Sequence, residues 1–547
     1  MEMTGGEALA AQLELEGVRD IFGIPGVQLD YAMDALARRA DRIRYLVTRH
    51  EQAATYMADG YARSSDRVGV AMVVPGPGVL NAAAGLATAY SCSSRVVLIA
   101  GQIPSPHIGE GLGLLHEIPA QGDLLASLTK WSARAVTPGE VPSLVRRAFG
   151  EVRSGRPRPV AVEVPPDVLS ARADVTLIEP EGAEDSGRIV PDESLLDQAA
   201  DLLRHARRPV IYAGGGIRAA GASAALAALA RCLGAPVVVS PFGHGALSDR
   251  DPLALSALAG QRVLAEADVL LGVGSRFVTG GGRPIATDGR VILINADAHD
   301  LGGVRTPELA LLADARLALE ALMARLEGTE ASEWGPAAAR DARAWAEERL
   351  QAIAPQVAWL RALRRALPED GILVDELTQV GYVARVAFPV YRPGAYLSPG
   401  YQGTLGYGFP TALGAKVANP DRAVLSVTGD GGFGWGLGEL ATAVQHGIGL
   451  VTVLFNDRAF GNVRRIQQNQ FEGRVIASEL RNPDYVGLAA AFGAVGRRVD
   501  DPAALEIAVR EAIAADAPTL IEVPVGPMPN PWPILEPWMA SRYRDPS

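Results

Sequence analysis

The sequence predicts an α/β protein built from three doubly wound parallel sheets, one in each of three domains. Short apolar runs rich in β-branched residues alternate with Ala- and Leu-rich stretches of helical length throughout the chain. The length of 547 residues exceeds the roughly 250–300 at which one hydrophobic core stops growing. An acidic, Gly- and Pro-containing stretch at 179–192 and a charged, Ala-rich stretch at 327–350 separate the blocks. These observations predict domains over residues 1–178, 193–326 and 351–530.

The expected strands are the short buried runs, taken here in chain order. In the first domain they cover residues 68–74, 96–100 and 160–164, with helices at 51–63 and 79–90. In the second domain they cover residues 210–212, 237–239, 269–273 and 291–294. In the third domain they cover residues 372–374, 423–428, 450–455 and 519–523. The stretch 327–350 is expected to be a solvated connecting helix. The Pro- and Trp-rich residues 526–547 are expected to cover a surface or an interface.

Charge and cysteine content exclude several classes of protein. The net charge is −11 with no basic block, which argues against nucleic-acid binding. No apolar run approaches the ~20 residues that a membrane span needs, and residues 1–12 lack the features of a signal peptide. The only cysteines, Cys92 and Cys232, exclude a disulfide framework or a cysteine-ligated metal. A soluble, cytoplasmic protein is expected.

The turn after the expected strand at 423–428 combines glycines with one carboxylate. It consists of Gly429, Asp430, Gly431 and Gly432, and a helical pattern is expected to begin at Leu437. Small residues at the carboxyl end of a strand let the backbone approach a phosphate group. A carboxylate beside a diphosphate is repulsive unless a divalent cation lies between them, and this predicts magnesium.

The next expected strand, at 450–455, ends in a second group of oxygen ligands. Asn456 and Asp457 follow it directly, and adjacent parallel strands bring their carboxyl ends to the same edge of a sheet. Two such turns can therefore bind one ion. A lone Gly-Asp-Gly is common in turns, whereas Gly-Asp-Gly followed one strand later by Asn-Asp is much more specific.

This combination resembles the thiamine diphosphate enzymes, in particular the group with acetolactate synthase, benzoylformate decarboxylase and benzaldehyde lyase. The resemblance covers about residues 8–525 and names the domains pyrimidine-binding, central and diphosphate-binding. It implies that Asp430, Asp457 and the backbone carbonyl of Ala459 bind Mg²⁺, with Asn456 as the alternative to Asp457. The residues that it places at the cofactor diphosphate are Thr378, Gln379, Gly429, Gly431, Gly432, Phe460 and Gly461.

The segment from Gly403 to Gly408 resembles a second family motif, G-x-[LM]-G-[FY]-[AG]. The resemblance implies that Leu405 lies under the cofactor and bends it, and that the Gly403 carbonyl accepts a hydrogen bond from the aminopyrimidine. Ordinary core packing is the alternative for Leu405. Pro25 belongs to a loop that faces the cofactor and substrate in relatives.

A third motif, Arg-His-Glu followed by Ala-Asp-Gly-Tyr-Ala-Arg, resembles the activating-glutamate sequence of the family and places its carboxylate at Glu51. By composition alone, a Glu at a helix start is more often a dipole partner or a solvated charge. The resemblance implies that Glu51 hydrogen-bonds the pyrimidine ring and so promotes loss of the thiazolium C2 proton. Asn81 ends a G-P-G-x-x-N segment and is expected to fix that turn near the pyrimidine. In the family these residues and the metal motif meet across a subunit boundary, which implies a homodimer at least and a homotetramer by preference.

The sequence departs from its relatives in the central domain and at the substrate. The stretch at 256–263 is short, and Phe277 precedes Val-Thr where FAD-binding acetolactate synthases have Asp-Asp, so FAD is doubtful as a cofactor. Ile466 stands where synthases that prefer 2-oxobutyrate have Trp. His116 and Gln28 are the candidates for proton transfer or substrate binding, with an ordinary surface residue as the alternative for His116.

The expected function is that of a Mg²⁺- and thiamine diphosphate-dependent carboligase with decarboxylase activity on 2-oxo acids. A decarboxylase that releases an aldehyde is the first alternative, because a placed acid such as His116 favours protonation over carboligation. A lyase or hydrolase that cleaves a diketone or 2-hydroxyketone is the second. A regulatory protein that binds the cofactor without turnover is disfavoured by the presence of Glu51, which diphosphate binding does not need.

Overall fold

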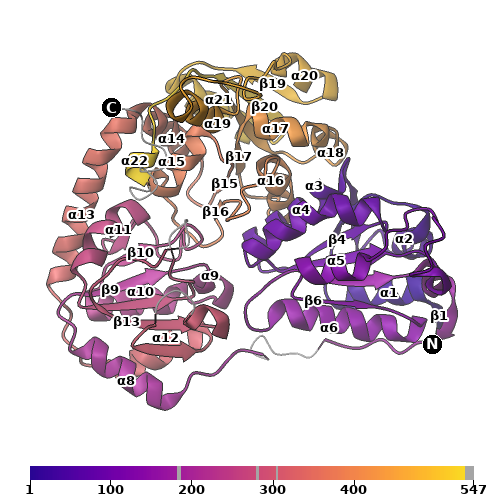
Figure 1. Cartoon of the computed structure of the whole chain (residues 1–547), viewed down its shortest axis with the longest axis horizontal. Helices are drawn as coiled ribbons and strands as arrows, with labels where there is room; N and C mark the ends of the chain where they lie inside the picture. The colour runs from indigo at the N-terminus through magenta and orange to yellow at the C-terminus, as the bar shows by residue number, and fades with distance from the viewer. Residues whose placement is uncertain (181–186, 279–282, 303–305, 536–547) are drawn as a thin grey trace.

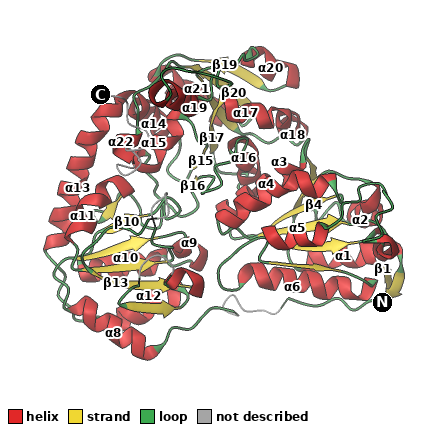
Figure 2. Cartoon of the chain, viewed as in Figure 1, coloured by secondary structure: helices red, strands yellow, loops and turns green. Residues whose placement is uncertain are grey.

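The computed structural model of the chain describes residues 1–180, 187–278, 283–302 and 306–535. It contains three parallel six-stranded sheets, each covered by helices (Figures 1 and 2), which confirms the predicted fold class. The stretches expected at 179–192 and 526–547 lie partly outside the described residues. No helix among the described residues is both long and apolar enough to cross a membrane.

The first sheet has the strand order β3-β2-β4-β5-β7-β6. Its expected strands are confirmed as β4 (Gly69–Val73), β5 (Val96–Gly101) and β7 (Val160–Val164). The strands that the sequence did not predict are β2 (Asp20–Gly23), β3 (Arg44–Val47) and β6 (Trp131–Arg134). The two edge strands, β3 and β6, mix polar with apolar residues and stay partly exposed, so they lack the continuous apolar run of a central parallel strand. A separate antiparallel pair joins β1 (Glu2–Thr4) to β8 (Arg172–Asp174).

The second sheet has the order β11-β10-β9-β12-β13-β14. Its four expected strands are confirmed as β9 (Pro209–Ala213), β10 (Val237–Val239), β12 (Val269–Val273) and β13 (Arg290–Asn295). The edge strands β11 (Ala254–Leu255) and β14 (Leu309–Leu312) were not predicted, because one is very short and the other alternates in burial.

The third sheet has the order β16-β15-β17-β18-β20-β19, again with parallel pairing throughout. The expected strands are confirmed as β15 (Ile372–Asp375), β17 (Val424–Gly429), β18 (Val451–Asn456) and β20 (Thr519–Pro524). The edge strands β16 (Tyr396–Leu397) and β19 (Val495–Arg498) were not predicted. Because β15, β17 and β18 are neighbours, their carboxyl ends form one continuous edge.

The helices cover both faces of these sheets (Figure 1). Those of the first domain are α1 (Gly5–Leu15), α2 (Asp30–Ala37), α3 (Glu51–Ser64), α4 (Pro77–Ser91), α5 (Gln121–Leu128), α6 (Val141–Arg153) and α7 (Pro166–Ser170). The central helices are α8 (Glu193–Arg204), α9 (Gly216–Ala220), α10 (Ser223–Leu233), α11 (Ala257–Glu266), α12 (Ala315–Arg325) and the connecting α13 (Trp334–Leu350). Those of the third domain are α14 (Ala354–Ala366), α15 (Gln379–Ala387), α16 (Gly408–Ala418), α17 (Asp430–Gly436), α18 (Leu440–Gln445), α19 (Gly461–Gln470), α20 (Tyr485–Phe492), α21 (Pro502–Ala515) and α22 (Trp532–Leu535).

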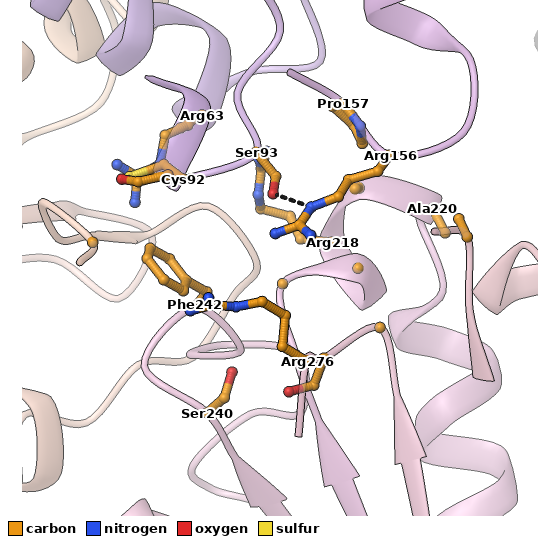
Figure 3. A pocket seen from close by; sticks show the side chains of 18 of the residues that line it. Arg63, Cys92, Ser93, Arg156, Pro157, Arg218, Ala220, Ser240, Phe242 and Arg276 are labelled. Carbon is orange, nitrogen blue, oxygen red and sulfur yellow. Dashed lines mark hydrogen bonds between the residues drawn. The ribbon is translucent and has the colours of Figure 1, made fainter. Parts of the chain in front are cut away.

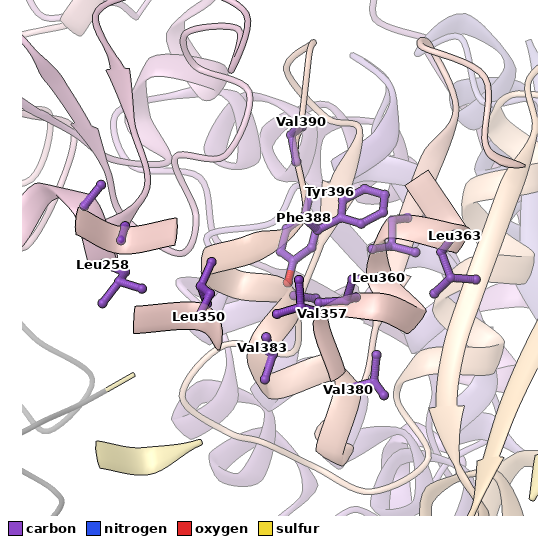
Figure 4. Close-up of a cluster of buried hydrophobic side chains, with 14 of the residues drawn as sticks. Leu258, Leu350, Val357, Leu360, Leu363, Val380, Val383, Phe388, Val390 and Tyr396 are labelled. Carbon is purple, nitrogen blue, oxygen red and sulfur yellow. The ribbon is translucent and has the colours of Figure 1, made fainter. Parts of the chain in front are cut away.

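The connecting helix α13 is solvated on one side only, which corrects the expectation for residues 327–350. Ala339, Ala342, Ala346 and Leu350 form a buried stripe along it. This stripe belongs to a hydrophobic cluster that continues into α14 and α15 (Figure 4). The helix therefore joins the cores of the central and third domains, and its small residues give the close approach that such packing needs.

Helices α3 and α16 join the first domain to the third through close backbone contact. A Cβ atom on Gly60 would lie 1.9 Å from the carbonyl oxygen of Thr411, and one on Gly414 would lie 1.9 Å from that of Met57. Glycine is required at both positions because neither backbone can move away. Figure 1 shows this crossing between the indigo and orange parts of the chain.

Candidate active site

The carboxyl ends of β15, β17 and β18 place one group of predicted residues together. Gly429 at the end of β17 pairs with Phe455 in β18, so the residues that follow each strand lie side by side. Thr378 caps α15 by accepting a hydrogen bond from the Gly381 amide over 2.8 Å. A Cβ atom on Gly429 would lie 3.2 Å from Cγ2 of Thr378. The turn after β15 and the turn after β17 are thus in contact.

The helix after β17 begins at Asp430, and the expectation that it begins at Leu437 is wrong. Gly429 is its N-cap, and Asp430 is its first residue. The glycine-rich sequence of α17 has little helical preference, so the tertiary contacts fix this helix. The backbone amides of the turn from Gly429 to Gly432 therefore lie at a helix N-terminus, which favours an anion such as a phosphate group.

Two carboxylates converge beside this N-terminus. Burial raises the pKa of Asp430, and burial followed by the charge of Asp430 raises the pKa of Asp457 to about 6. Gln379 donates a hydrogen bond to Oδ2 of Asp457 over 2.8 Å, and Asn482 donates one to Oδ2 of Asp430 over 2.6 Å. Two buried carboxylates that repel each other are what a divalent cation with oxygen ligands stabilises.

The orientation of Asn456 distinguishes it from Asp457. Asn456 ends β18, and its amide donates to Oε1 of Glu522 over 2.7 Å while its oxygen accepts from Asn482 over 2.9 Å. Asp457 instead interacts with Gln379 and Asp430 at the sheet edge. This arrangement supports Asp457 as the side-chain ligand.

The turn after Asp457 is shaped by contacts on both sides of Ala459. Arg458 has φ +55°, an unusual conformation for a residue with a side chain. The Phe460 amide donates to the Ser478 carbonyl over 2.9 Å, and the Leu480 amide donates to that of Arg458 over 2.8 Å. A Cβ atom on Gly461 would lie 2.4 Å from Oδ2 of Asp457, so only glycine leaves room for this carboxylate.

The Gly403–Gly408 segment lies over the same edge. Gly403 and Gly406 adopt φ +55° and +80°, and the Gly406 amide donates to Oε1 of Glu376 over 2.8 Å. Leu405 is only partly buried and belongs to none of the hydrophobic core clusters found among the described residues. Ordinary core packing therefore does not account for Leu405.

The first domain supplies a second group of predicted residues at the carboxyl edge of its own sheet. Glu51 is the first residue of α3 and is 9% exposed. Asn81 donates a hydrogen bond to Oε2 of Glu51 over 2.9 Å. From the sequence, we expected Asn81 to fix the preceding turn. In the structure Asn81 lies inside α4 and contacts Glu51 directly. That turn is formed by Gly76, with φ +58°.

His116 and Gln28 meet at this edge. Nδ1 of His116 lies 3.1 Å from Oε1 of Gln28, whose amide nitrogen donates to the Leu115 carbonyl over 3.1 Å. Because the amide oxygen can only accept, Nδ1 is the donor in this hydrogen bond, and Nε2 is left for another partner. A Cβ atom on Gly76 would lie 2.3 Å from the His116 carbonyl. Pro25 is exposed on the adjacent loop.

Residues beside Glu51 contact the third domain of the same chain. The Glu439 carboxylate accepts from the amides of Arg49 and His50, and α3 packs on α16. Among the described residues, no recorded hydrogen bond or ion pair joins Glu51 to Asp430 or Asp457. We call the two groups of residues the first-domain half-site and the third-domain half-site.

The arrangement of three domains agrees with comparisons of the sequence with known proteins. Residues 3–124 match the thiamine pyrophosphate enzyme N-terminal TPP binding domain, 196–322 match the central domain, and 378–523 match the C-terminal TPP binding domain. The chain belongs to the thiamine pyrophosphate enzyme family.

Named relatives cover nearly the whole chain. A probable 2-ketoarginine decarboxylase, AruI, of Pseudomonas aeruginosa is 38% identical over 95% of this chain and 94% of its own length. A probable acetolactate synthase large subunit of Methanocaldococcus jannaschii is 33% identical over 96% and 92%, respectively. The isozyme 3 large subunit of acetolactate synthase of Escherichia coli is 32% identical over 94% and 93%. The protein is thus a thiamine diphosphate-dependent enzyme of transferase or lyase chemistry.

Two residues that sequence reasoning missed contribute to the third-domain half-site of this family member. Asn482 bridges Asp430 and Asn456, and Glu376 contacts the Gly403–Gly408 segment. The Asn-Pro pair at 482–483 marks a turn, which is the signal that could have found Asn482. Glu376 follows an apolar strand, in the same way as Asp430 and Asp457.

A cavity of about 1270 Å³ lies between the first and central domains and extends to the third. Figure 3 shows Arg156, Arg218 and Arg276 around it, with Arg156 donating to Ser93 over 2.9 Å. Burial, followed by the charges of Arg63 and Arg95, lowers the pKa of Arg218 to about 10. The lining is thus strongly cationic and complementary to a ligand with phosphate groups.

Proposed function

We propose that this protein is a Mg²⁺- and thiamine diphosphate-dependent decarboxylase that converts a 2-oxo acid to an aldehyde. The observation that carries this choice is the His116–Gln28 pair at the edge that holds Glu51. A histidine with a fixed proton on Nδ1 can deliver or accept a proton through Nε2, and a placed acid favours protonation of the product carbon over carboligation. The 38% identity to a probable 2-ketoarginine decarboxylase supports this choice.

An acetolactate synthase-like carboligase is the second candidate. Acetolactate synthase large subunits of several organisms are 30–33% identical to the chain over nearly its full length. Both candidates share the loss of CO₂ and differ only in what reacts with the product carbon. Ile466 lies in α19, which follows the proposed metal-binding turn. In a carboligase, this side chain would affect which acceptor the enzyme prefers.

The metal part of the proposal rests on the third-domain half-site. Asp430, Asp457 and the carbonyl oxygen of Ala459 would bind Mg²⁺, and the repulsion between the two carboxylates supports this role. The residues that would hold the diphosphate are Thr378, Gln379, Gly429, Gly431, Gly432, Phe460 and Gly461. Gly403 and Leu405 would contact the rings. When bound, thiamine diphosphate supplies an electron sink for the bond that breaks.

The first-domain half-site would complete the active site from a second subunit. Glu51, held by Asn81, would accept and return a proton at the pyrimidine ring, and Pro25 would line the entrance. Apolar side chains around this half-site are exposed in the isolated chain, among them Val27, Leu80, Leu112 and Leu115. Such a patch marks a protein interface, and this supports a homodimer at least and a homotetramer by preference.

The domain limits 1–178, 193–326 and 351–530 and the cytoplasmic location belong to the same proposal. Each predicted domain contains one complete sheet, and the family matches fall inside these limits. That FAD is doubtful as a cofactor stays a prediction. The cationic cavity could accept a dinucleotide such as FAD, but it could equally accept a smaller anion. An absorbance spectrum of the purified protein tests the prediction, since a bound flavin absorbs visible light and the polypeptide does not.

The deciding experiment is incubation with a panel of 2-oxo acids that includes pyruvate and 2-ketoarginine, with and without an aldehyde acceptor. Release of CO₂ with an aldehyde as the product is expected. An acyloin or acetohydroxy acid as the main product would establish the second candidate. Absence of CO₂ from every acid would contradict both and favour the diketone or 2-hydroxyketone cleavage.

The role of Glu51 is tested separately by exchange of the C2 proton of bound cofactor in deuterated solvent. Glu51→Gln is expected to abolish exchange at measurable cofactor affinity. Exchange at the wild-type rate would contradict the activating role. A wild-type protein that binds the cofactor without exchange or turnover would instead support a regulatory protein.

A further inference from the structure

Glu376 is a buried carboxyl group to which the proposed function gives no role. It follows Asp375, the last residue of β15, at the edge where the third-domain half-site forms. Its exposure is 2%, and burial raises its pKa to about 7. A carboxyl group is kept in such a place only where hydrogen bonds compensate for the loss of water.

These hydrogen bonds come from two separate segments. The Gly406 amide donates to Oε1 over 2.8 Å, and the backbone of Tyr407 and Gly408 also interacts with the carboxyl group. From the opposite side, the hydroxyl of Thr428, two residues before Asp430, donates to Oε2. One carboxyl group therefore links the segment that carries Leu405 to the strand that carries the Gly429–Gly432 turn.

The surrounding glycines fit this carboxyl group closely. A Cβ atom on Gly432 would lie 2.2 Å from Oε1 of Glu376, and one on Gly408 would lie 3.1 Å from Cβ of Glu376. Any larger residue at 432 would displace the carboxyl group or the turn. Glu376 thus fills the space between the two segments and hydrogen-bonds to each.

We propose that Glu376 is a positioning residue that holds the Gly403–Gly408 segment in a fixed relation to the Gly429–Gly432 turn. Leu405 and the Gly403 carbonyl are thereby fixed relative to the metal-binding carboxylates, although Glu376 itself need not touch the cofactor. This inference rests on the proposed cofactor site and adds the residue that aligns its two parts. A displacement of about 1 Å between parts of an active site can reduce a rate by about 100-fold.

The first test needs no cofactor and so is independent of the proposed function. Amide hydrogen exchange of the cofactor-free protein is compared between wild type, Glu376→Gln and the control Asp375→Asn. The control neutralises the adjacent buried carboxyl group. That group accepts a hydrogen bond from the Tyr396 hydroxyl over 2.6 Å, so its partner differs from those of Glu376. Faster exchange by 10-fold or more in peptides 403–408 and 428–432 is expected for Glu376→Gln alone. Equal exchange in all three proteins would overturn the inference.

The second test measures C2 proton exchange and the dissociation constant of thiamine diphosphate with Mg²⁺. Glu376→Gln is expected to slow C2 exchange 10- to 100-fold while the dissociation constant rises less than 10-fold, because alignment is lost more than binding. Glu376→Asp, which keeps the charge on a shorter side chain, is expected to recover part of the rate. Thr428→Val removes one donor and is expected to produce a smaller loss of the same kind, which keeps the test available if Glu376→Gln does not fold.

Two outcomes separate the inference from the function on which it rests. A wild-type protein that does not bind thiamine diphosphate with Mg²⁺ would overturn the proposed function, whatever the amide exchange shows. Wild-type binding and C2 exchange, together with an unchanged rate in Glu376→Gln or an equal loss in Asp375→Asn, would overturn the inference about Glu376 alone.

Discussion

At the scale of single residues, the half-sites depend on charged groups whose partners are specific. Glu51 accepts from Asn81, Asp457 from Gln379 and Asp430 from Asn482. Each amide donor fixes one carboxylate oxygen and leaves the other available for a ligand, since an ionised carboxylate has acceptor sites on both oxygens. Amides are suited to this purpose because they orient a carboxylate without neutralising its charge.

Loss of the Asn81 amide should reduce activity by disordering Glu51. Asn81→Ala is expected to lower kcat about 10- to 100-fold, since hydrogen bonds to charged groups contribute about 1.5–3 kcal/mol. Asn81→Asp should be worse, because a second carboxylate beside Glu51 favours the protonated form of both. Steady-state rates at several cofactor concentrations check this ordering. Both variants within twofold of wild type would refute it.

Asp249 gives a prediction about pH and stability. It joins the central domain to the third, with its carboxylate accepting from the Val390 amide over 2.7 Å, and burial raises its pKa from 3.8 to about 6. The folded state therefore binds this proton more tightly than the unfolded state does. The stabilisation is complete below about pH 3.8 and is lost as the pH rises through about 6.

Asp249→Asn should remove this dependence. Relative to the wild type, its free energy of unfolding should increase by about 1.4 kcal/mol between pH 5 and pH 7.5, because roughly one pH unit of this range lies below the raised pKa and each unit is worth about 1.36 kcal/mol. Urea unfolding at both pH values measures the difference. A constant difference across this range would show that Asp249 does not titrate with the raised pKa.

At the scale of elements, the sites depend on where strands and helices end. Most central strands were predictable because strands buried on both faces are continuous apolar runs; the exception is β2, whose four residues begin with Asp20 and end with Gly23. The edge strands were not, because partial exposure lets polar residues enter them. Helix α17 was placed too late because its glycine-rich first turn has no helical pattern of its own; the end of β17 and the packing of Phe433 fix it.

The crossing of α3 and α16 provides a prediction at this scale. Gly414→Ala is expected to destabilise the protein by about 3 kcal/mol or more, since overpacking costs about 1–3 kcal/mol and here backbone meets backbone. Thermal unfolding of the cofactor-free protein measures the loss. Gly150→Ala is the control, because this helical glycine has no atom within 4 Å of an added Cβ atom and the change should be neutral or stabilising.

At the scale of the whole molecule, the proposed homodimer concerns how the two half-sites come together. The contact between α3 and α16 uses the first domain to brace the third domain of the same chain. We propose that a second subunit brings its Glu51 to the third-domain half-site of the first. Exposed apolar residues on the third domain, such as Trp435 and Val463, would be covered in the same assembly.

Complementation tests this arrangement. Glu51→Gln and Asp430→Asn should each be nearly inactive alone. A mixed dimer of the two should contain one site with both defects and one with neither, so co-expressed or remixed subunits should recover up to about a quarter of wild-type activity, as random pairing into two-fold dimers implies. Activity is measured alongside the dimer population. Absence of recovery from a confirmed mixed dimer would show that each site forms within one chain.

The sequence by itself determined the family and the three sheets, and it predicted most residues of both half-sites, because motifs at strand ends require particular small or acidic residues wherever the backbone approaches a diphosphate. Tertiary structure alone decided which of these residues contact one another. It paired Asn81 with Glu51, His116 with Gln28, and Asn482 with Asp430, and it placed Glu376 between two loops. The physical reason is that hydrogen bonds and close packing join residues far apart in the chain, and no local pattern records such distances.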